Sequence, residues 1–121
     1  MDVIDVFPSE VKYVVKCLKE VYKTDADARR QQLSPVDRLR LHQERSKPVM
    51  DELYRWLKQQ FDERKVEPNS SLGKAISYML KRWDQLTLFL RVAGAPLDNN
   101  IAEQALKMAS RHRRYAKLPI M

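Results

Sequence analysis

Four polar residues near the carboxyl end of the chain carry side chains that could hold a metal ion. Asp98, Asn99 and Asn100 are consecutive, and Glu103 follows three positions later. Metal sites usually need two or three clustered His, Asp or Glu ligands, so this group is one carboxylate short of a convincing cluster. The same residues also suit a helix start, where Asn100 caps the helix and Glu103 completes a capping box or pairs with Lys107. One cap needs one such residue and three are present, so both interpretations stay open.

The other residue types that support catalysis are few. Cys17 is the only cysteine, which rules out an intrachain disulfide and a cysteine-based zinc site. Its apolar neighbours predict a buried thiol. The only imidazoles, His42 and His112, have no suggestive partners nearby in the sequence, and we expect both at the surface. These residues therefore indicate no nucleophilic site.

Positive charge is concentrated after Glu103. No acidic residue follows it, while five cations do, and the whole chain has a net charge of +7. The five are Lys107, Arg111, Arg113, Arg114 and Lys117. Cations near a helix C-terminus are favourable in themselves. They also suit contact with DNA phosphates, which does not depend on base sequence. Both interpretations stay open.

The elements that position these residues are predicted to be helices. Only two glycines are present, and good helix formers dominate the 121 residues. We expect an all-α protein, with about five helices in a compact bundle and residues 1–121 forming a single helical domain. The expected helices start at Ser9, at Ser34 with Pro35 and Asp37 as its capping signals, and after Pro48. Pro48 allows either a kink or a fresh start. A helix-turn-helix over 34–64 is disfavoured, because no clear turn signal separates its halves.

The strongest pattern predicts a long central helix over residues 71–92. Its apolar residues repeat with the 4-3-4-3-4 spacing of a heptad seam: Leu72, Ile76, Met79, Trp83, Leu86 and Leu90. Ser70 or Ser71 caps its start, and Gly94 and Pro96 end it. A last helix then begins within 97–100 and carries Glu103. No apolar run is long enough to span a membrane, and there is no signal-peptide pattern, so we expect a soluble, cytoplasmic protein with no membrane or small-molecule partner.

Beyond these patterns, three stretches resemble IS66-family transposases over nearly the whole chain. They are "LSPVDRLRLHQERSKPVMDELYRWL", "SSLGKAISYMLKRWDQLTLFL" and "PLDNNIAEQALK", followed by "RHRRY". The resemblance implies a DDE-type enzyme for DNA strand cleavage and transfer, in which three acidic residues hold two Mg²⁺ ions. It also implies DNA, at transposon ends, as the partner.

The resemblance carries over to individual residues. It makes Glu103 the third acidic residue, hence the catalytic and metal-binding one, with Asp98, Asn99 and Asn100 as the motif that orients it. The basic pair of the family falls on Arg113 and Arg114, and Lys107 and Arg111 extend the implied DNA contact. The chain departs from the family pattern at Gln104, Met108, His112 and Tyr115, which puts the shape of the DNA-facing loop in doubt.

The first two catalytic aspartates of such an enzyme lie on strands. Asp2 and Asp5 have no strand-rich sequence around them. We therefore expect a truncated transposase fragment that is inactive alone and binds no Mg²⁺ by itself. Two other hypotheses remain open. One is a small basic DNA-binding module. The other is a homo-oligomerising module, with a homodimer covering exposed apolar surface.

Overall fold

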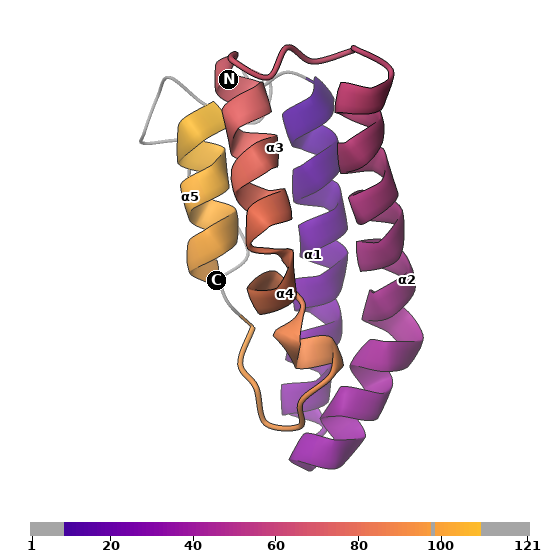
Figure 1. Ribbon diagram of the computed structural model, residues 1–121. Helices are drawn as coiled ribbons and strands as arrows, with labels where there is room; N and C mark the ends of the chain where they lie inside the picture. The colour runs from indigo at the N-terminus through magenta and orange to yellow at the C-terminus, as the bar shows by residue number, and fades with distance from the viewer. Residues whose placement is uncertain (1–8, 98, 110–121) are drawn as a thin grey trace.

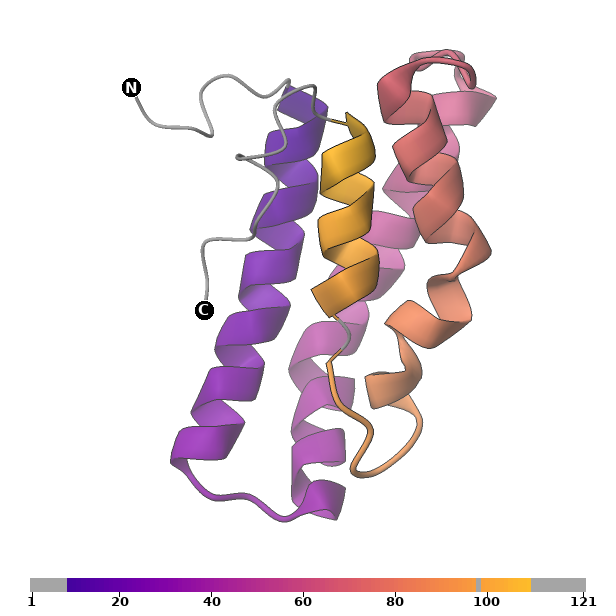
Figure 2. The same cartoon turned by 90° about the vertical axis from the view of Figure 1, so that its left-hand side faces the viewer.

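A bundle of four long helices forms the body of the molecule (Figures 1 and 2). The computed structural model describes residues 9–97 and 99–109. In chain order the helices are α1 (Ser9–Arg30), α2 (Pro35–Asp62), α3 (Ser71–Lys81), the short α4 (Trp83–Leu86), the 3₁₀ helix η2 (Leu88–Leu90) and α5 (Asn99–Ala109). The long helices run alternately down and up, so that sequence neighbours are antiparallel. The described residues contain no strand, which confirms the all-α prediction.

The start of α2 has the cap that the sequence predicts. The backbone N–H of Asp37 donates to the Ser34 hydroxyl at 3.2 Å, and Pro35 occupies the first turn. Helix α3 is capped in the same way, because the N–H of Gly73 donates to the Ser70 hydroxyl at 3.0 Å. These bonds satisfy backbone donors that have no partner inside the helix.

Helix α2 is continuous across Pro48, where the sequence allowed two separate helices. Its buried residues stay in phase on both sides of the proline: His42, Ser46, Met50, Leu53 and Leu57. Pro48 and Glu44 are both exposed, so the backbone carbonyl that loses its partner at the proline lies on the side where water can replace it. No turn interrupts α2, and the helix-turn-helix alternative is wrong.

The prediction of one long helix over 71–92 is also wrong, because the helix breaks after Lys81 and again at Thr87. Side chains donate hydrogen bonds to backbone carbonyls near these breaks. The Thr87 hydroxyl donates to the Trp83 carbonyl at 2.7 Å, and the Arg91 guanidinium donates to the Asp84 carbonyl at 2.6 Å. Such bonds compete with a regular helix. Most of the predicted seam is still buried, so the heptad spacing correctly identified the buried side but not the continuity.

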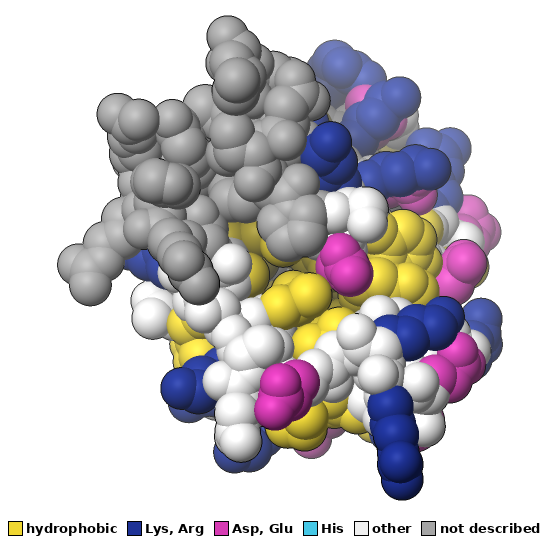
Figure 3. All heavy atoms as spheres, turned by 90° about the horizontal axis from the view of Figure 1, so that it is seen from above, with side chains coloured by type: hydrophobic (Ala, Val, Ile, Leu, Met, Phe, Trp, Pro, Cys, Tyr) yellow, Lys and Arg dark blue, Asp and Glu magenta, His cyan; other side chains and the backbone are white. Residues whose placement is uncertain are grey.

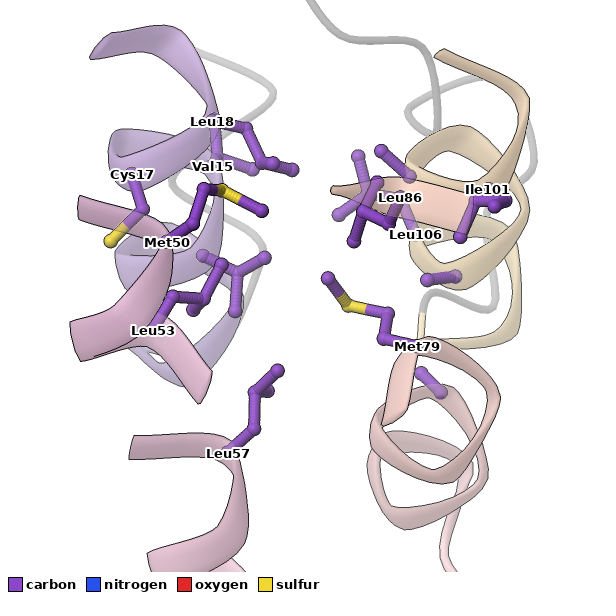
Figure 4. Close-up of a cluster of buried hydrophobic side chains, with 14 of the residues drawn as sticks. Val15, Cys17, Leu18, Met50, Leu53, Leu57, Met79, Leu86, Ile101 and Leu106 are labelled. Atoms are coloured by element: carbon purple, nitrogen blue, oxygen red, sulfur yellow. The ribbon is translucent and has the colours of Figure 1, made fainter. Parts of the chain in front are cut away.

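The core lies between two helix pairs, α1 with α2 and α3 with α5 (Figure 4). Side chains from the first pair, among them Val15, Leu18, Met50 and Leu53, point toward Met79, Leu86 and Leu106 from the other elements. Cys17 is buried in this cluster, as predicted. Seen from the end where α1 begins, hydrophobic side chains lie toward the middle and charged ones toward the rim (Figure 3). No described helix is long and apolar enough to cross a membrane.

Candidate functional site

Helix α5 holds Glu103 in a fixed position. Four residues of this helix are buried against the core: Ile101, Ala102, Ala105 and Leu106. Glu103 lies beside this buried face and is half-buried, whereas Gln104 and Lys107 are exposed. The small side chains of Ala102 and Ala105 let α5 pack close to α3.

The Glu103 carboxylate has no structural use that the described residues reveal. Within residues 9–97 and 99–109 it accepts no hydrogen bond and forms no ion pair. Lys107 stands one helical turn away on the same face, but the predicted ion pair between the two is not formed. The helix-capping interpretation of this glutamate therefore has no bond to support it in this part of the chain.

The motif before Glu103 is only partly described. Helix α5 begins at Asn99, and Asn100 is exposed in its first turn. Asp98 lies outside the described residues, as do Asp2 and Asp5. Across the described ranges, no group of three or more His, Cys, Asp or Glu side chains is placed to hold a metal ion. The residues described here thus do not fit a two-Mg²⁺ site by themselves.

The predicted DNA-binding residues are likewise divided. Lys107 is exposed on α5, and three further residues of the prediction, Arg111, Arg113 and Arg114, lie outside the described residues. What the structure brings together is therefore one half-buried carboxylate and one exposed cation on the same face of a short helix.

The sequence of this helix and of the bundle around it matches a known family model. The model, described as Transposase IS66 family, matches residues 2–118. The chain belongs to the IS66 transposase family. The resemblance seen in the sequence is confirmed at this level.

Two relatives of this IS66 chain come from Sinorhizobium fredii. The uncharacterized protein y4hP is 39% identical over 82 residues, which cover 68% of this chain and 14% of y4hP. The uncharacterized protein y4jD is 36% identical over 98 residues, which cover 81% of this chain and 18% of y4jD. This IS66 chain thus spans less than a fifth of the length of these relatives. No solved structure matches it.

A polar network inside the IS66 bundle was missed by the sequence analysis, which expected His42 at the surface. His42 is buried, with 2% of its surface exposed. Its Nε2 lies 3.0 Å from Asp25 Oδ1 and its Nδ1 lies 2.8 Å from Ser46 Oγ. A carboxylate only accepts, so in the neutral ring Nε2–H donates to Asp25 and Nδ1 accepts from the Ser46 hydroxyl. The ring of Phe89 lies edge-on to the imidazole, with the two ring centroids 4.8 Å apart.

This network has the residue types of a catalytic triad but serves the fold. Ser46 is 1% exposed, so a substrate cannot reach its hydroxyl. The hydrogen bond from His42 lowers the pKa of Asp25, and the nearby Arg29 cation, 3.0 Å from Asp25 Oδ2, lowers it further. The His42–Asp25 bond joins α2 to α1, whereas the His42–Ser46 bond lies within α2. The signal was available in the sequence, because His42 and Ser46 lie eight and four positions before Met50 on one helical face.

A second feature missed from sequence is a hollow of about 530 Å³ where α2 meets the break between α3 and α4. The rings of Tyr54 and Trp83 lie 5.2 Å apart beside it. The charges in its lining balance, because Arg55 and Lys81 lie with Asp51 and Asp84. The other lining residues are Tyr54, Leu80 and Trp83. That balance selects neither an anion nor a cation.

Proposed function

We propose that this chain is the helical part of an IS66 transposase, that it contributes Glu103 as the third acidic residue of the catalytic centre, and that it holds DNA through the basic residues after Glu103. It acts on transposon DNA in the cytoplasm and does not cleave DNA alone. Residues 1–121 act as one helical domain in this proposal. The single observation that carries it is the half-buried carboxylate on α5, which has no partner among the described residues.

The position of Glu103 argues for a role outside the fold. A carboxylate that served the bundle would gain from a hydrogen bond or an ion pair, and among the described residues Glu103 has neither. Catalytic carboxylates work best on rigid elements whose own packing fixes them. The buried residues on either side of Glu103, Ala102 and Ala105 among them, give α5 that rigidity.

Metal binding needs more than this residue. Two-metal strand cleavage requires several carboxylates around ions about 4 Å apart. Glu103 would hold Mg²⁺ only together with carboxylates from outside residues 9–97 and 99–109, in keeping with the much greater length of y4hP and y4jD. The proposal assigns those carboxylates to other segments or other chains of the transposase.

DNA binding is tested directly by fluorescence anisotropy of a labelled duplex at two salt concentrations. We expect binding that weakens steeply with salt, because released counterions drive it. The variant Arg113→Ala/Arg114→Ala should bind less tightly and with a smaller salt dependence. Arg45→Ala/Arg55→Ala is the matched control, since both of these arginines are exposed on α2. No binding by the unchanged chain at low salt, or equal losses in the two variants, would refute this part of the proposal.

Catalysis is tested on supercoiled plasmid DNA with Mg²⁺. We expect no nicking by the chain alone. Nicking that disappears in Glu103→Gln would show that the chain is itself an active nuclease. It would refute the proposal that the chain does not cleave DNA alone.

A homo-oligomerising module is the second candidate, favoured by exposed large hydrophobic residues. Val36 is 54% exposed, Leu88 41% and Val92 47%. Single exposed residues of this kind are common, so the candidate needs a direct test. Sedimentation should show concentration-dependent dimers that Leu88→Ser/Val92→Ser abolishes. A monomer at every concentration would refute this candidate.

A further inference from the structure

The outward face of α1 carries a row of lysines that the proposed catalytic and DNA-binding residues do not include. Lys12, Lys16, Lys19 and Lys23, here called the α1 lysine row, follow one another at spacings of 4, 3 and 4 residues. At about 100° per residue, these positions fall within a strip about 60° wide. The strip lies opposite the buried residues of α1, and three of the four lysines are exposed while Lys19 is half-buried.

A hollow of about 380 Å³ runs along this row. Its lining consists of the four lysines with Val15 and Glu20. Four cations and one carboxylate leave the hollow with a formal charge of +3. The surface is therefore chemically suited to an extended anion, in contrast to the charge-balanced hollow beside Tyr54.

Three of the four lysines in the row lack an acidic partner among residues 9–97 and 99–109. Lys16, Lys19 and Lys23 form no ion pair with any residue of the described ranges, although Glu20 stands within one turn of Lys16 and Lys23. The outer face of α2 differs, because cations there pair with acids along the same helix, as in Arg40–Asp37 and Lys47–Asp51. The described lining of the hollow has one acidic residue, Glu20, and four lysines, so positive charge is in excess there.

The arrangement has an energetic cost to the isolated chain. Like charges at i, i+3 and i, i+4 destabilise a helix at low salt. The row contains three such neighbours in succession, Lys12 with Lys16, Lys16 with Lys19 and Lys19 with Lys23. An anionic partner that fits the row would offset this repulsion.

We propose that the α1 lysine row binds the phosphate backbone of duplex DNA, as a contact surface additional to the basic residues after Glu103. The row is about 16 Å long, which matches roughly five base pairs at about 3.4 Å each. Ammonium groups on flexible stems suit phosphates as point charges and read no base sequence. Helices α1 and α5 are neighbours, since Val11 and Val14 share a small apolar cavity with Ala102 and Ala105 (Figure 2). The row lies on the opposite side of α1 from Val11 and Val14, so it forms a contact surface of its own. The inference rests on the proposed function.

The test compares two triple variants of equal charge in the same duplex anisotropy assay. Lys16→Gln/Lys19→Gln/Lys23→Gln removes most of the row. The control, Lys58→Gln/Lys74→Gln/Lys81→Gln, removes three exposed lysines of α2 and α3. We expect the row variant to bind at least tenfold more weakly at about 100 mM salt, with the slope of log K against log salt reduced by about 2.7 for three lost contacts. The control should lose less than threefold.

The outcomes separate this inference from the proposed function. Equal losses in the row and control variants would overturn the inference, while a specific loss in Arg113→Ala/Arg114→Ala would leave the proposed function standing. If the unchanged chain shows no salt-dependent binding, both the inference and the proposed DNA binding are refuted. Thermal unfolding of the row variant supplies a second readout. Its Tm should equal or exceed that of the unchanged chain, because repulsion is removed, and a lower Tm would mean that the lysines serve the fold instead.

Discussion

Replacing Asp25 by alanine should destabilise the bundle far more than an ordinary surface change. The carboxylate side chain is 11% exposed and accepts a hydrogen bond from the buried His42. A hydrogen bond to a charged group contributes about 1.5–3 kcal/mol, and its loss leaves the His42 Nε2–H buried without a partner. The exposed pair with Arg29 adds little, because solvent screens it. We expect the free energy of unfolding to fall by about 2–3 kcal/mol.

Urea unfolding followed by the fluorescence of Trp56 and Trp83 measures this change. Asp27→Ala is the matched control, because Asp27 is two residues away on α1 and pairs with the exposed Arg30. The control should lose less than about 1 kcal/mol. If Asp25→Ala lost no more than Asp27→Ala, the network would not join α1 to α2 as argued.

The same carboxylate predicts a pH dependence. The pKa of Asp25 is lowered in the folded state, first by the hydrogen bond from His42. A lowered folded-state pKa gives stability that is complete above the unfolded value of about 3.9 and is lost as the pH falls through the folded value. The unchanged chain should therefore lose stability on acidification over this range more steeply than Asp25→Asn. Parallel curves would contradict the assigned hydrogen bond.

Three further substitutions test other parts of the structure. Gly73→Ala should lower the free energy of unfolding in urea by more than about 2 kcal/mol, because an added Cβ would lie 2.2 Å from the Glu67 carbonyl oxygen. An unchanged free energy of unfolding would refute that close approach. Leu53→Ala should cost about 2–5 kcal/mol, because Leu53 is 0% exposed and its truncation leaves a cavity; a loss below 1 kcal/mol would contradict the packing in Figure 4. Glu103→Gln should change the free energy of unfolding by less than about 0.5 kcal/mol, and a larger loss would mean that the fold uses this carboxylate after all.

Local signals with a clear chemical cause predicted much of the fold. Ser34 and Ser70 cap helices because their hydroxyls meet backbone donors, and a single sequence shows this directly. Gly94, predicted to end the helix over 71–92, adopts a left-handed φ of +83° in the turn that follows η2.

The features that sequence did not predict depend on contacts between distant residues. The Gln43 side chain of α2 donates to the Leu90 carbonyl of η2 at 3.1 Å, a bond that no pattern within 71–92 indicates. His42 is buried because Asp25, seventeen residues earlier, lies opposite it across the α1–α2 interface. Helix α2 passes through Pro48 because its buried face continues in phase, a pattern that carried more weight than the proline alone.

The candidate site, too, was predicted only in part from the sequence. The motif around Glu103 predicted α5 and the family. It did not show whether Glu103 caps the helix or binds a metal ion, because both roles require the same residues in the same order. Among the described residues Glu103 forms no capping bond, so the capping hypothesis lacks support there, and the metal-ligand role stays a proposal. Charges that stabilise this fold have partners, as Asp25, Asp37 and Asp51 do. Glu103 and the lysines at 16, 19 and 23 have none among the described residues. Within the described ranges, the unpaired Glu103 carboxylate on α5 and the unpaired Lys16, Lys19 and Lys23 on the neighbouring α1 support the proposed contacts with metal ions and DNA.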